Sequence, residues 1–436
     1  MPTQNGSLIN ALHRLLLPLG GGSQFRRNFI GVAQANALAL VLPILATPLL
    51  SRLYTPDDFG ALGVFVSILT FAQAFCTWRF DWSLPNARSR TMAANLMVLG
   101  LSVSVFFCIA SSVILIFYSD TLLGALGFQI KYFEILLPLV IIASGGKLMF
   151  SSWFVRQGDL SIANRATVVQ SVSNAGLSIA GGLAHLGGLG LIGSAVLSTA
   201  AGVVTMAKRS SGQLAGWLLR VTPFSLAVTA RRFSREATWS TLVAVLNAVS
   251  LSAPLLLLAW YYSPRDIGWY ALMFRLLAVP AAVFGSAISQ SFWSVAAELA
   301  RTRRVGELNH LYKKTTLRLG LFCIPLVLGC LAGPLFIGRL LGVAEWQGAG
   351  YVLQAMTPLL IGSLVFSPTN HLVVFSRQSL QTLVDGIRLL LVAGSIVLAG
   401  TLELGFITAV ALSSFSSLAS HAILLPLHLR IHRQHG

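Results

Sequence analysis

Charged residues are scarce in this chain. Only 10% of its 436 residues are Asp, Glu, Lys or Arg, and 55% are hydrophobic, with a mean hydropathy of +0.78. A soluble globular protein carries about 25% charged residues. The apolar residues are enough to fill about twelve membrane-spanning helices of ~20 residues each. The composition excludes a soluble enzyme and a disordered chain, and it indicates a polytopic membrane protein.

Residues that would bind a metal or a nucleotide are also missing. The four cysteines lie within apolar runs and form no C-x-x-C pair, which excludes a disulfide scaffold and a zinc site. Residues 188–193 match the pattern G-x-G-x-x-G, but Lys208 and Arg209 follow where a dinucleotide site needs an acidic residue. These glycines instead suit close packing of helices. The sequence predicts neither a metal nor a cofactor.

Twelve apolar runs of spanning length predict an all-α protein with about twelve transmembrane helices. A long basic segment after the sixth run divides them into two sets of six. We expect helices over residues 29–50, 60–78, 94–117, 132–154, 163–184, 187–207, 238–261, 269–292, 314–336, 350–375, 381–401 and 404–427.

Acidic residues are the rarer charge, with 13 Asp and Glu against 30 Lys and Arg, and the net charge is +17. Twenty-four of the thirty basic residues fall on one side of the expected spans, together with both termini. Basic residues concentrate on the cytoplasmic side of membrane proteins. The basic composition therefore reflects topology rather than nucleic-acid binding, and it predicts cytoplasmic termini in a bacterial inner membrane. The expected outside loops are short, which disfavours a soluble outer domain.

The same pattern predicts the domain organisation. Residues 1–28 form a cytoplasmic arm that lacks the layout of a cleavable signal and contains an interfacial helix with leucines on one face. Residues 29–207 form the first six-helix bundle and residues 208–237 a cytoplasmic linker along the membrane surface. Residues 238–427 form the second bundle, and residues 428–436 the cytoplasmic tail.

A weak internal repeat relates the two halves. Residues 54–60 read YTPDDFG and residues 262–268 read YSPRDIG, with an offset of 208. Leu-Leu-Gly at residues 122–124 and again at 340–342, and the prolines Pro138 and Pro358, follow in the same order at nearly the same offset. Because each half has six spans, the two copies have the same orientation in the membrane. The sequence therefore predicts a parallel repeat of two bundles.

Two cationic residues lie deep within expected spans. Arg275 is about six residues into the eighth span, and Lys147 is well inside the fourth, beside Gly145 and Gly146. A charge at this depth costs ~2.5 kcal/mol or more unless it faces a cavity or a partner. A water-filled cavity for an anionic substrate explains both, while a structural ion pair or a snorkelling side chain is the competing interpretation.

Other charges lie near the ends of the expected spans. Arg79 and Asp81 close the second span and suit either a gate with a substrate contact or an anchor at the lipid headgroups. Glu134 opens the fourth span, and it or Asp81 is a candidate for ion coupling. Asp385 and Arg388, three residues apart, predict a salt bridge that neutralises both charges.

Several stretches, ordered over about 400 residues, resemble the polysaccharide transport family of oligosaccharide-lipid flippases, within the multidrug/oligosaccharidyl-lipid/polysaccharide exporter superfamily. The stretches that carry the resemblance are RLYTPDDFG at 52–60, RFD at 79–81 with LP at 84–85, FVRQ at 154–157, the glycines of 187–193, GSAISQ at 285–290, LG at 341–342, Trp346, GYVLQ at 350–354 and Pro358. One departure is Arg235-Glu236-Ala237, where the family often has a proline-containing turn.

The resemblance implies two six-helix bundles around a central cavity and a non-enzymatic function. The family moves polyprenyl-pyrophosphate-linked oligosaccharides from the inner to the outer leaflet for O-antigen or exopolysaccharide synthesis. It implies that Arg275 contacts the pyrophosphate, with Lys147, Arg52 and Arg79 as further substrate-binding candidates. The implied partners are the lipid-linked oligosaccharide, membrane lipids, a polysaccharide polymerase and a chain-length regulator, and no nucleic acid.

Three alternatives stay open. A drug/cation antiporter of the same superfamily would need unpaired acidic residues in its cavity, whereas the deep charges here are basic. A glycan polymerase or ligase would need a large catalytic outer loop. A major-facilitator transporter also has twelve spans, but its basic loop after the second span is absent from residues 79–90.

Overall fold

The computed structural model describes residues 39, 41–218, 221–302, 304–342, 344–366 and 378–434, and every regular element in these ranges is a helix. The expected arm at residues 1–28 lies outside the described residues, as does most of the first expected span. The remainder of that span forms a helix over Val41–Leu53. The all-α class predicted from composition is confirmed.

Helices of the first half follow the expected spans closely. In chain order they are α3 (Pro56–Gln73), α4 (Phe80–Ser83), a short 3₁₀ turn (Leu84–Asn86), α5 (Arg90–Ala125), α6 (Phe133–Gln157), α7 (Leu160–Leu183) and α8 (Gly188–Leu218).

The described part of the second half contains both long helices and a run of short ones. They are α9 (Pro223–Tyr261), α10 (Pro264–Arg301), α11 (Val305–Leu331), α12 (Gly333–Leu341), a 3₁₀ turn (Ala344–Trp346), α13 (Gln347–Ala355), α14 (Thr357–Ile361), a π-helical turn (Gly362–Phe366), α15 (Gln378–Thr401) and α16 (Phe406–Gln434).

Helix occupies most of the described part of each of the twelve expected ranges, although the helix in the range 60–78 ends at Gln73. Six of the described helices are long and apolar enough by themselves to cross a membrane, and the broken helix over residues 344–366, bent by 50°, makes a seventh. Other helices are shorter or more polar. For example, α7 carries Gln170 and Asn174, which hydrogen-bond to α8. A criterion based on hydropathy alone therefore misses helices whose polar side chains face the protein interior.

The expected linker at residues 208–237 is largely helical, which corrects the expected ends of two spans. α8 continues to Leu218 and α9 begins at Pro223, so only four residues separate them. Thr222 caps α9 with its hydroxyl, and Asn95 of α5 donates hydrogen bonds to the Ser225 carbonyl and the Thr229 hydroxyl. The charged start of α9 thus packs on the first bundle, through Asn95 of α5.

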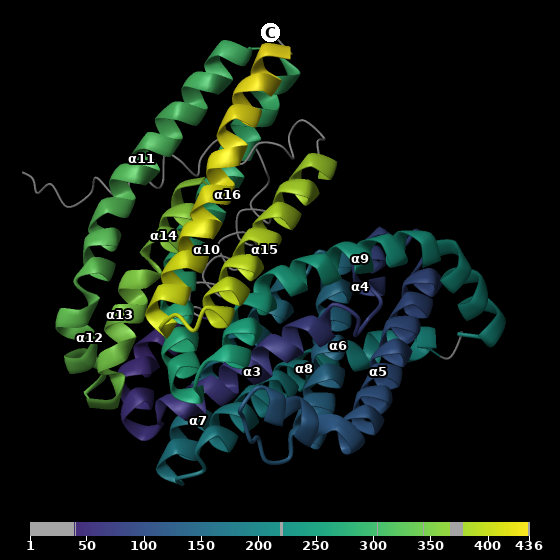
Figure 1. Cartoon of the computed structure of the whole chain (residues 1–436). Helices are drawn as coiled ribbons and strands as arrows, with labels where there is room; N and C mark the ends of the chain where they lie inside the picture. The colour runs from purple at the N-terminus through teal and green to yellow at the C-terminus, as the bar shows by residue number, and fades with distance from the viewer. Residues whose placement is uncertain are drawn as a thin grey trace, which may run out of the picture.

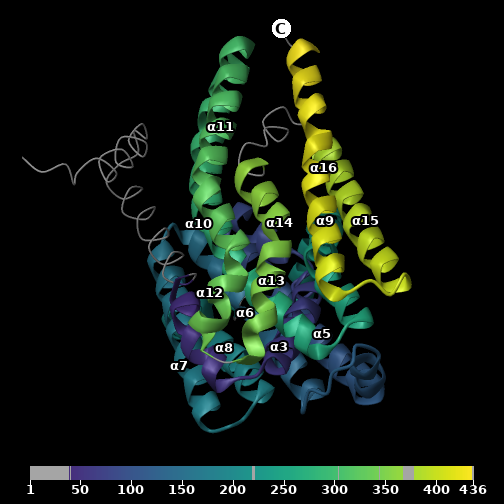
Figure 2. The ribbon, with the colours of Figure 1, turned by 60° about the vertical axis from the view of Figure 1, so that its left-hand side comes forward.

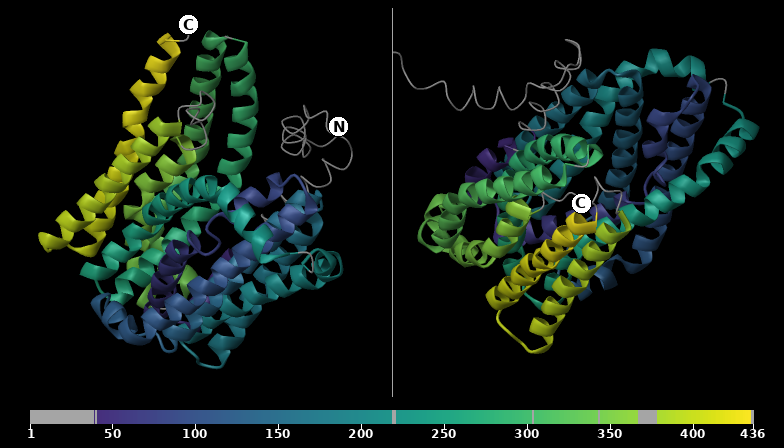
Figure 3. Two further views of the ribbon diagram at one scale, coloured as in Figure 1. Left: turned by 90° about the vertical axis from the view of Figure 1, so that its right-hand side faces the viewer. Right: turned by 90° about the horizontal axis from the view of Figure 1, so that it is seen from above.

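The two halves form two groups of helices that meet at one end and diverge toward the other (Figures 1 and 2). We call the end that holds Pro56, Gly268 and Trp346 the closed end, and the end that holds α4 and the start of α11 the diverging end. Seen from above, the two groups stand side by side (Figure 3). α9 is shared: it contacts α4 and α5 of the first group and α15 of the second.

The buried apolar core follows the same division. The largest cluster joins both halves and includes Phe59, Ile267 and Trp346. A second cluster, around Met97 and Met149, lies mainly in the first half, and a third lies between α10 and α11. Apolar burial therefore holds the halves together chiefly at the closed end.

The internal repeat is a duplicated helix start. Thr55 caps α3 by accepting from the Asp58 backbone N–H, and Ser263 accepts from Asp266 in the same way. A proline occupies the first helical turn in both, where its missing N–H costs nothing. Each copy ends on a glycine at the contact between α3 and α10. An added Cβ at Gly60 would lie 2.5 Å from the Pro264 carbonyl oxygen, and one at Gly268 would lie 1.8 Å from that of Pro56.

Candidate functional site: a central cavity with one arginine

A cavity of about 500 Å³ lies between the two bundles. Its wall is mostly apolar, with hydroxyl and amide side chains on the side formed by α7 and α8. Its lining residues come from five helices: Phe59, Leu62, Gly63, Val66, Ser67 and Thr70 of α3; Asn174 and Ser178 of α7; Leu191, Ser194 and Ala195 of α8; Leu251, Ser252 and Leu255 of α9; and Tyr270, Ala271, Phe274, Arg275 and Ala278 of α10.

Arg275 carries the only formal charge among the described residues that line this cavity. It lies three turns into α10, and no carboxylate of the described residues forms an ion pair with it. The hydroxyl oxygen of Ser252, in the same wall, is buried without a hydrogen-bond partner. A guanidinium has five N–H donors in a planar fork that matches phosphate or carboxylate. The cavity therefore offers an unpaired cationic donor to an anionic group.

Lys147 lies away from this cavity wall. Its ammonium donates to the side-chain oxygen of Gln170, and the Gln170 amide donates to the Thr199 hydroxyl at 3.0 Å. Asn174, one turn further along α7, bonds to Ser198 and lines the cavity. The lysine is thus held inside the first bundle. The polar residues of α7 and α8 that surround it extend to Asn174, which lines the cavity.

Arg52 and Glu134 lie at the closed end. Arg52 is exposed and lies against Gly342 of the other half, where an added Cβ would be 2.7 Å from the arginine Nε. Glu134 is in the first turn of α6 and is half-buried. Neither residue is among those that line the central cavity.

Arg79 and Asp81 lie at the diverging end, Arg79 immediately before α4 and Asp81 in its first turn. Their charged groups are 4.0 Å apart, and Thr77 donates a 2.5 Å hydrogen bond to the buried Asp81 carboxylate. The Arg79 guanidinium also lies 5.3 Å from the centre of the Trp82 ring. Arg79 has a positive φ of 56°, which is uncommon for a residue with a side chain. Of the four cations expected to bind substrate, only Arg275 lines the central cavity.

The polar residues Asn174, Ser178, Ser194 and Ser252 were not expected in the site. Each is a single small polar residue within an apolar run, and such residues occur throughout membrane helices without a common role. The spacing of Asn174 and Ser178 on one face of α7 is the one signal that could have indicated a polar wall.

Three solved structures have an overall fold similar to that of this chain. The structure is similar to an inward-facing multidrug resistance MATE family transporter of the MOP superfamily, with a TM-score of 0.72 and 13% identity over 98% of both chains. It is also similar to the lipid II flippase MurJ in an inward closed conformation, with a TM-score of 0.65 and 13% identity over 91% of this chain and 87% of that one. A third similar structure is a MOP superfamily transporter from Pyrococcus furiosus, reported with a binding pocket of reverse polarity, with a TM-score of 0.55 and 14% identity over 94% and 96% of the chains.

The chain thus shares the fold of these structures, built from two repeated helix bundles, and its apolar helices are those of a multi-pass membrane protein. A family model described as polysaccharide biosynthesis protein matches residues 49–349, which is more than two thirds of the chain. No curated protein sequence matches the chain significantly. The chain belongs to the polysaccharide biosynthesis protein family, as the resemblance of its sequence motifs predicted.

Proposed function

We propose that the protein is a flippase that moves polyprenyl-pyrophosphate-linked oligosaccharides from the cytoplasmic to the periplasmic leaflet by alternating access. The observation that carries the proposal is Arg275, an unpaired cation in a cavity between the two bundles. Arginine binds phosphate through paired, charge-assisted hydrogen bonds. The oligosaccharide would serve O-antigen or exopolysaccharide synthesis, and a polymerase and a chain-length regulator would act on the delivered units.

The positive-inside bias supports an orientation in the inner membrane with both termini in the cytoplasm. In that orientation the closed end faces the periplasm and the diverging end faces the cytoplasm. The similarity to the inward-facing MATE structure exceeds that to an outward-facing structure, with TM-scores of 0.72 and 0.59. We therefore assign the structure to the state that receives substrate from the cytoplasmic leaflet.

Size limits what the cavity holds at one time. A volume of about 500 Å³ suits the pyrophosphate and the first sugars, so the polyprenyl chain would stay in the lipid. The other candidate residues would act outside this cavity. Arg79 and Asp81 would act at the cytoplasmic entrance and Arg52 at the periplasmic contact. Lys147 and Glu134 would act indirectly, from positions within the first bundle.

Reconstituted transport tests the role of Arg275. Purified variants in liposomes are supplied with a fluorescent polyprenyl-pyrophosphate oligosaccharide, and its appearance in the outer leaflet is followed by quenching. We expect Arg275→Ala to slow flipping by about tenfold or more, because a hydrogen bond to a charged group contributes about 1.5–3 kcal/mol. Arg275→Lys should retain part of the rate, since the charge remains without the fork.

The matched control is Arg339→Ala, which removes an exposed arginine from α12, away from the cavity. It should flip substrate at the wild-type rate. Wild-type flipping by Arg275→Ala at equal protein density would overturn the assignment. Export of cationic drugs that persists in Arg275→Ala, with no lipid flipping by the wild type, would favour the drug/cation antiporter instead.

A further inference from the structure

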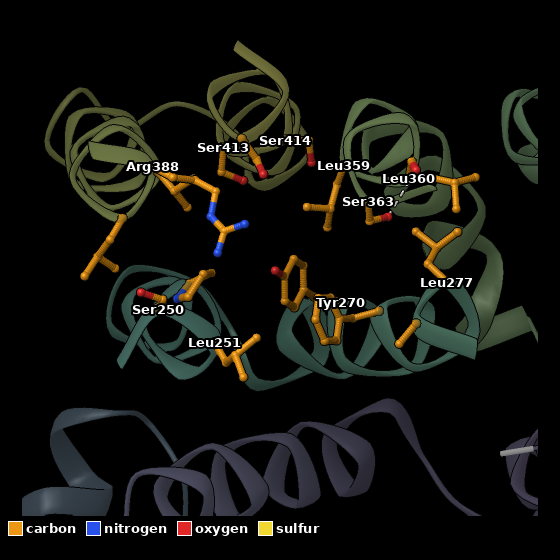
Figure 4. A pocket seen from close by; sticks show the side chains of 16 residues that line it. Ser250, Leu251, Tyr270, Leu277, Leu359, Leu360, Ser363, Arg388, Ser413 and Ser414 are labelled. Carbon is orange, nitrogen blue, oxygen red and sulfur yellow. Dashed lines mark hydrogen bonds between the residues drawn. The ribbon is translucent and has the colours of Figure 1, made fainter. Parts of the chain in front are cut away.

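A second cavity, of about 280 Å³, lies within the second bundle (Figure 4). α9, α10, α14 with its π-helical turn, α15 and α16 surround it. Tyr270 and Phe274 line both this cavity and the central one, and their rings stack with centroids 6.0 Å apart. These two rings therefore form a wall between the two cavities.

Arg388 of α15 projects its guanidinium into this second cavity, toward the hydroxyl group of Tyr270 (Figure 4). Its ion-pair partner is Asp385, one turn earlier on the same helix, at 3.6 Å. A paired arginine–carboxylate contact is about 2.7–2.9 Å long. The long contact confirms the salt bridge expected from the sequence, but it leaves the N–H fork of Arg388 directed into the cavity.

Apolar side chains make up nine of the sixteen residues that line this cavity, and Tyr270 and five serines supply hydroxyl groups. Ser250, Ser363 and Ser413 donate to carbonyls of their own helices, at 2.9 to 3.1 Å. No hydrogen bond from the hydroxyls of Tyr270, Ser414 or Ser417 to a described residue is found, and all three side chains are buried. The cavity therefore combines one guanidinium with O–H groups that are free to donate.

The charge of the lining points to the kind of ligand. Among the described lining residues Arg388 is the only charged one, and no carboxylate is among them. Asp385 pairs with Arg388 at 3.6 Å, and the ring of His421 stacks on Phe366 with the ring centroids 6.0 Å apart. The volume exceeds that of a water molecule, about 30 Å³ in the liquid, several times over. It has room for a hydrated inorganic anion but not for a lipid-linked glycan.

We propose that this cavity is a binding site for a small inorganic anion, of the class of chloride or phosphate, held by the Arg388 guanidinium and the Tyr270 hydroxyl. Such an ion would supply acceptors to the N–H groups of Arg388 that Asp385 does not take up, within a spanning helix where unsatisfied polar groups are costly. It would also brace the Tyr270–Phe274 wall from the side away from the central cavity. Arg275 does not line this site, although Tyr270 lines both cavities, and the proposal does not rest on the proposed function.

Thermal unfolding of the full-length protein in detergent tests the site. Sodium gluconate is replaced stepwise by sodium chloride or by sodium phosphate, at constant pH and ionic strength. We expect the melting temperature of the wild type to rise and saturate, because a ligand that binds only the folded state stabilises it. Arg388→Gln should raise the apparent Kd about tenfold or more, and Tyr270→Phe about fivefold, the size expected for one hydrogen bond.

Arg339→Gln is the matched control, and it should keep the wild-type anion response because Arg339 is exposed on α12 and lines neither this cavity nor the central one. An anion-dependent shift of equal size in the wild type, Arg388→Gln and Tyr270→Phe would overturn the proposal. No shift in the wild type would also overturn it, and Tyr270→Phe decides the matter if Arg388→Gln does not fold. If only an added anionic phospholipid produces a shift that depends on Arg388, the ligand is a lipid headgroup and the free-ion assignment is wrong.

Discussion

Substituting Gly268 by alanine should force the closed end apart. The added Cβ would lie 1.8 Å from the Pro56 carbonyl oxygen, 2.5 Å from its carbonyl carbon and 3.0 Å from its Cα. All three atoms are backbone, so no side chain can turn away to relieve the overlap. An ordinary Cβ contact begins at 3.4 Å, and the starts of α3 and α10 must therefore separate by about 1.6 Å.

The size of the effect follows from overpacking. Extra carbon atoms in a well-packed contact cost about 1–3 kcal/mol. Alanine also raises helix propensity by about 1 kcal/mol, but this gain is the same in both conformations and cancels. The penalty applies only to molecules in which the starts of α3 and α10 are in contact. The ratio of closed to open molecules should fall by about 5- to 150-fold, with the backbone location favouring the upper part of this range.

Distances between spin labels measure that ratio. In a variant whose four cysteines are replaced by serine, labels at Lys131 and Arg339 lie on exposed positions of the two halves at the closed end. Gly268→Ala should shift the distance distribution toward longer values. Gly193→Ala is the control, because an added Cβ there meets nothing within 4 Å. Identical distributions for the two alanine variants would refute the reasoning.

Two further substitutions test contacts outside the cavity. Trp346→Phe should loosen the closed end slightly and Trp346→Ala strongly, because Trp346 donates to the Ser51 carbonyl at 3.0 Å and is fully buried; the same label distances measure both variants. Gln170→Leu should destabilise the protein by about 1–3 kcal/mol, since it leaves the Lys147 ammonium without its acceptor, and adding Lys147→Met should recover much of the loss in thermal unfolding. Equal stability of the wild type and Gln170→Leu would contradict the second expectation.

Much of the fold was predictable because long apolar runs have few stable alternatives in a membrane. The helical character of residues 208–218 and 223–237 was missed, since these parts of α8 and α9 lie beyond the apolar runs and carry many charges. Their stability comes from tertiary contacts such as Asn95 with Thr229. No hydropathy pattern reveals a contact between residues 134 positions apart.

The site was predictable only in part, because depth in a span does not determine which cavity a side chain faces. Arg275 and Lys147 were both expected to be deep, and both are within spanning helices. Lys147 is directed to Gln170 inside one bundle, whereas Arg275 lines the cavity between the bundles. Arg388 was correctly paired with Asp385, but the cavity into which it projects is built from four other helices. Such convergence depends on packing between helices distant in sequence.

Under the proposed alternating access the closed end must be both held and released, and the contact made by the duplicated motif is suited to this. Because the two halves have the same orientation, each motif brings its glycine to the same side of the membrane, against the proline carbonyl of the other. The contact is backbone against backbone, so forming it immobilises no long side chain and breaking it exposes no buried charge. Its attraction is limited to dispersion and weak Cα–H···O contacts. Glycine at residues 60 and 268 therefore permits a close approach whose own backbone contact costs little to break, which suits the gate that the proposed alternating access requires.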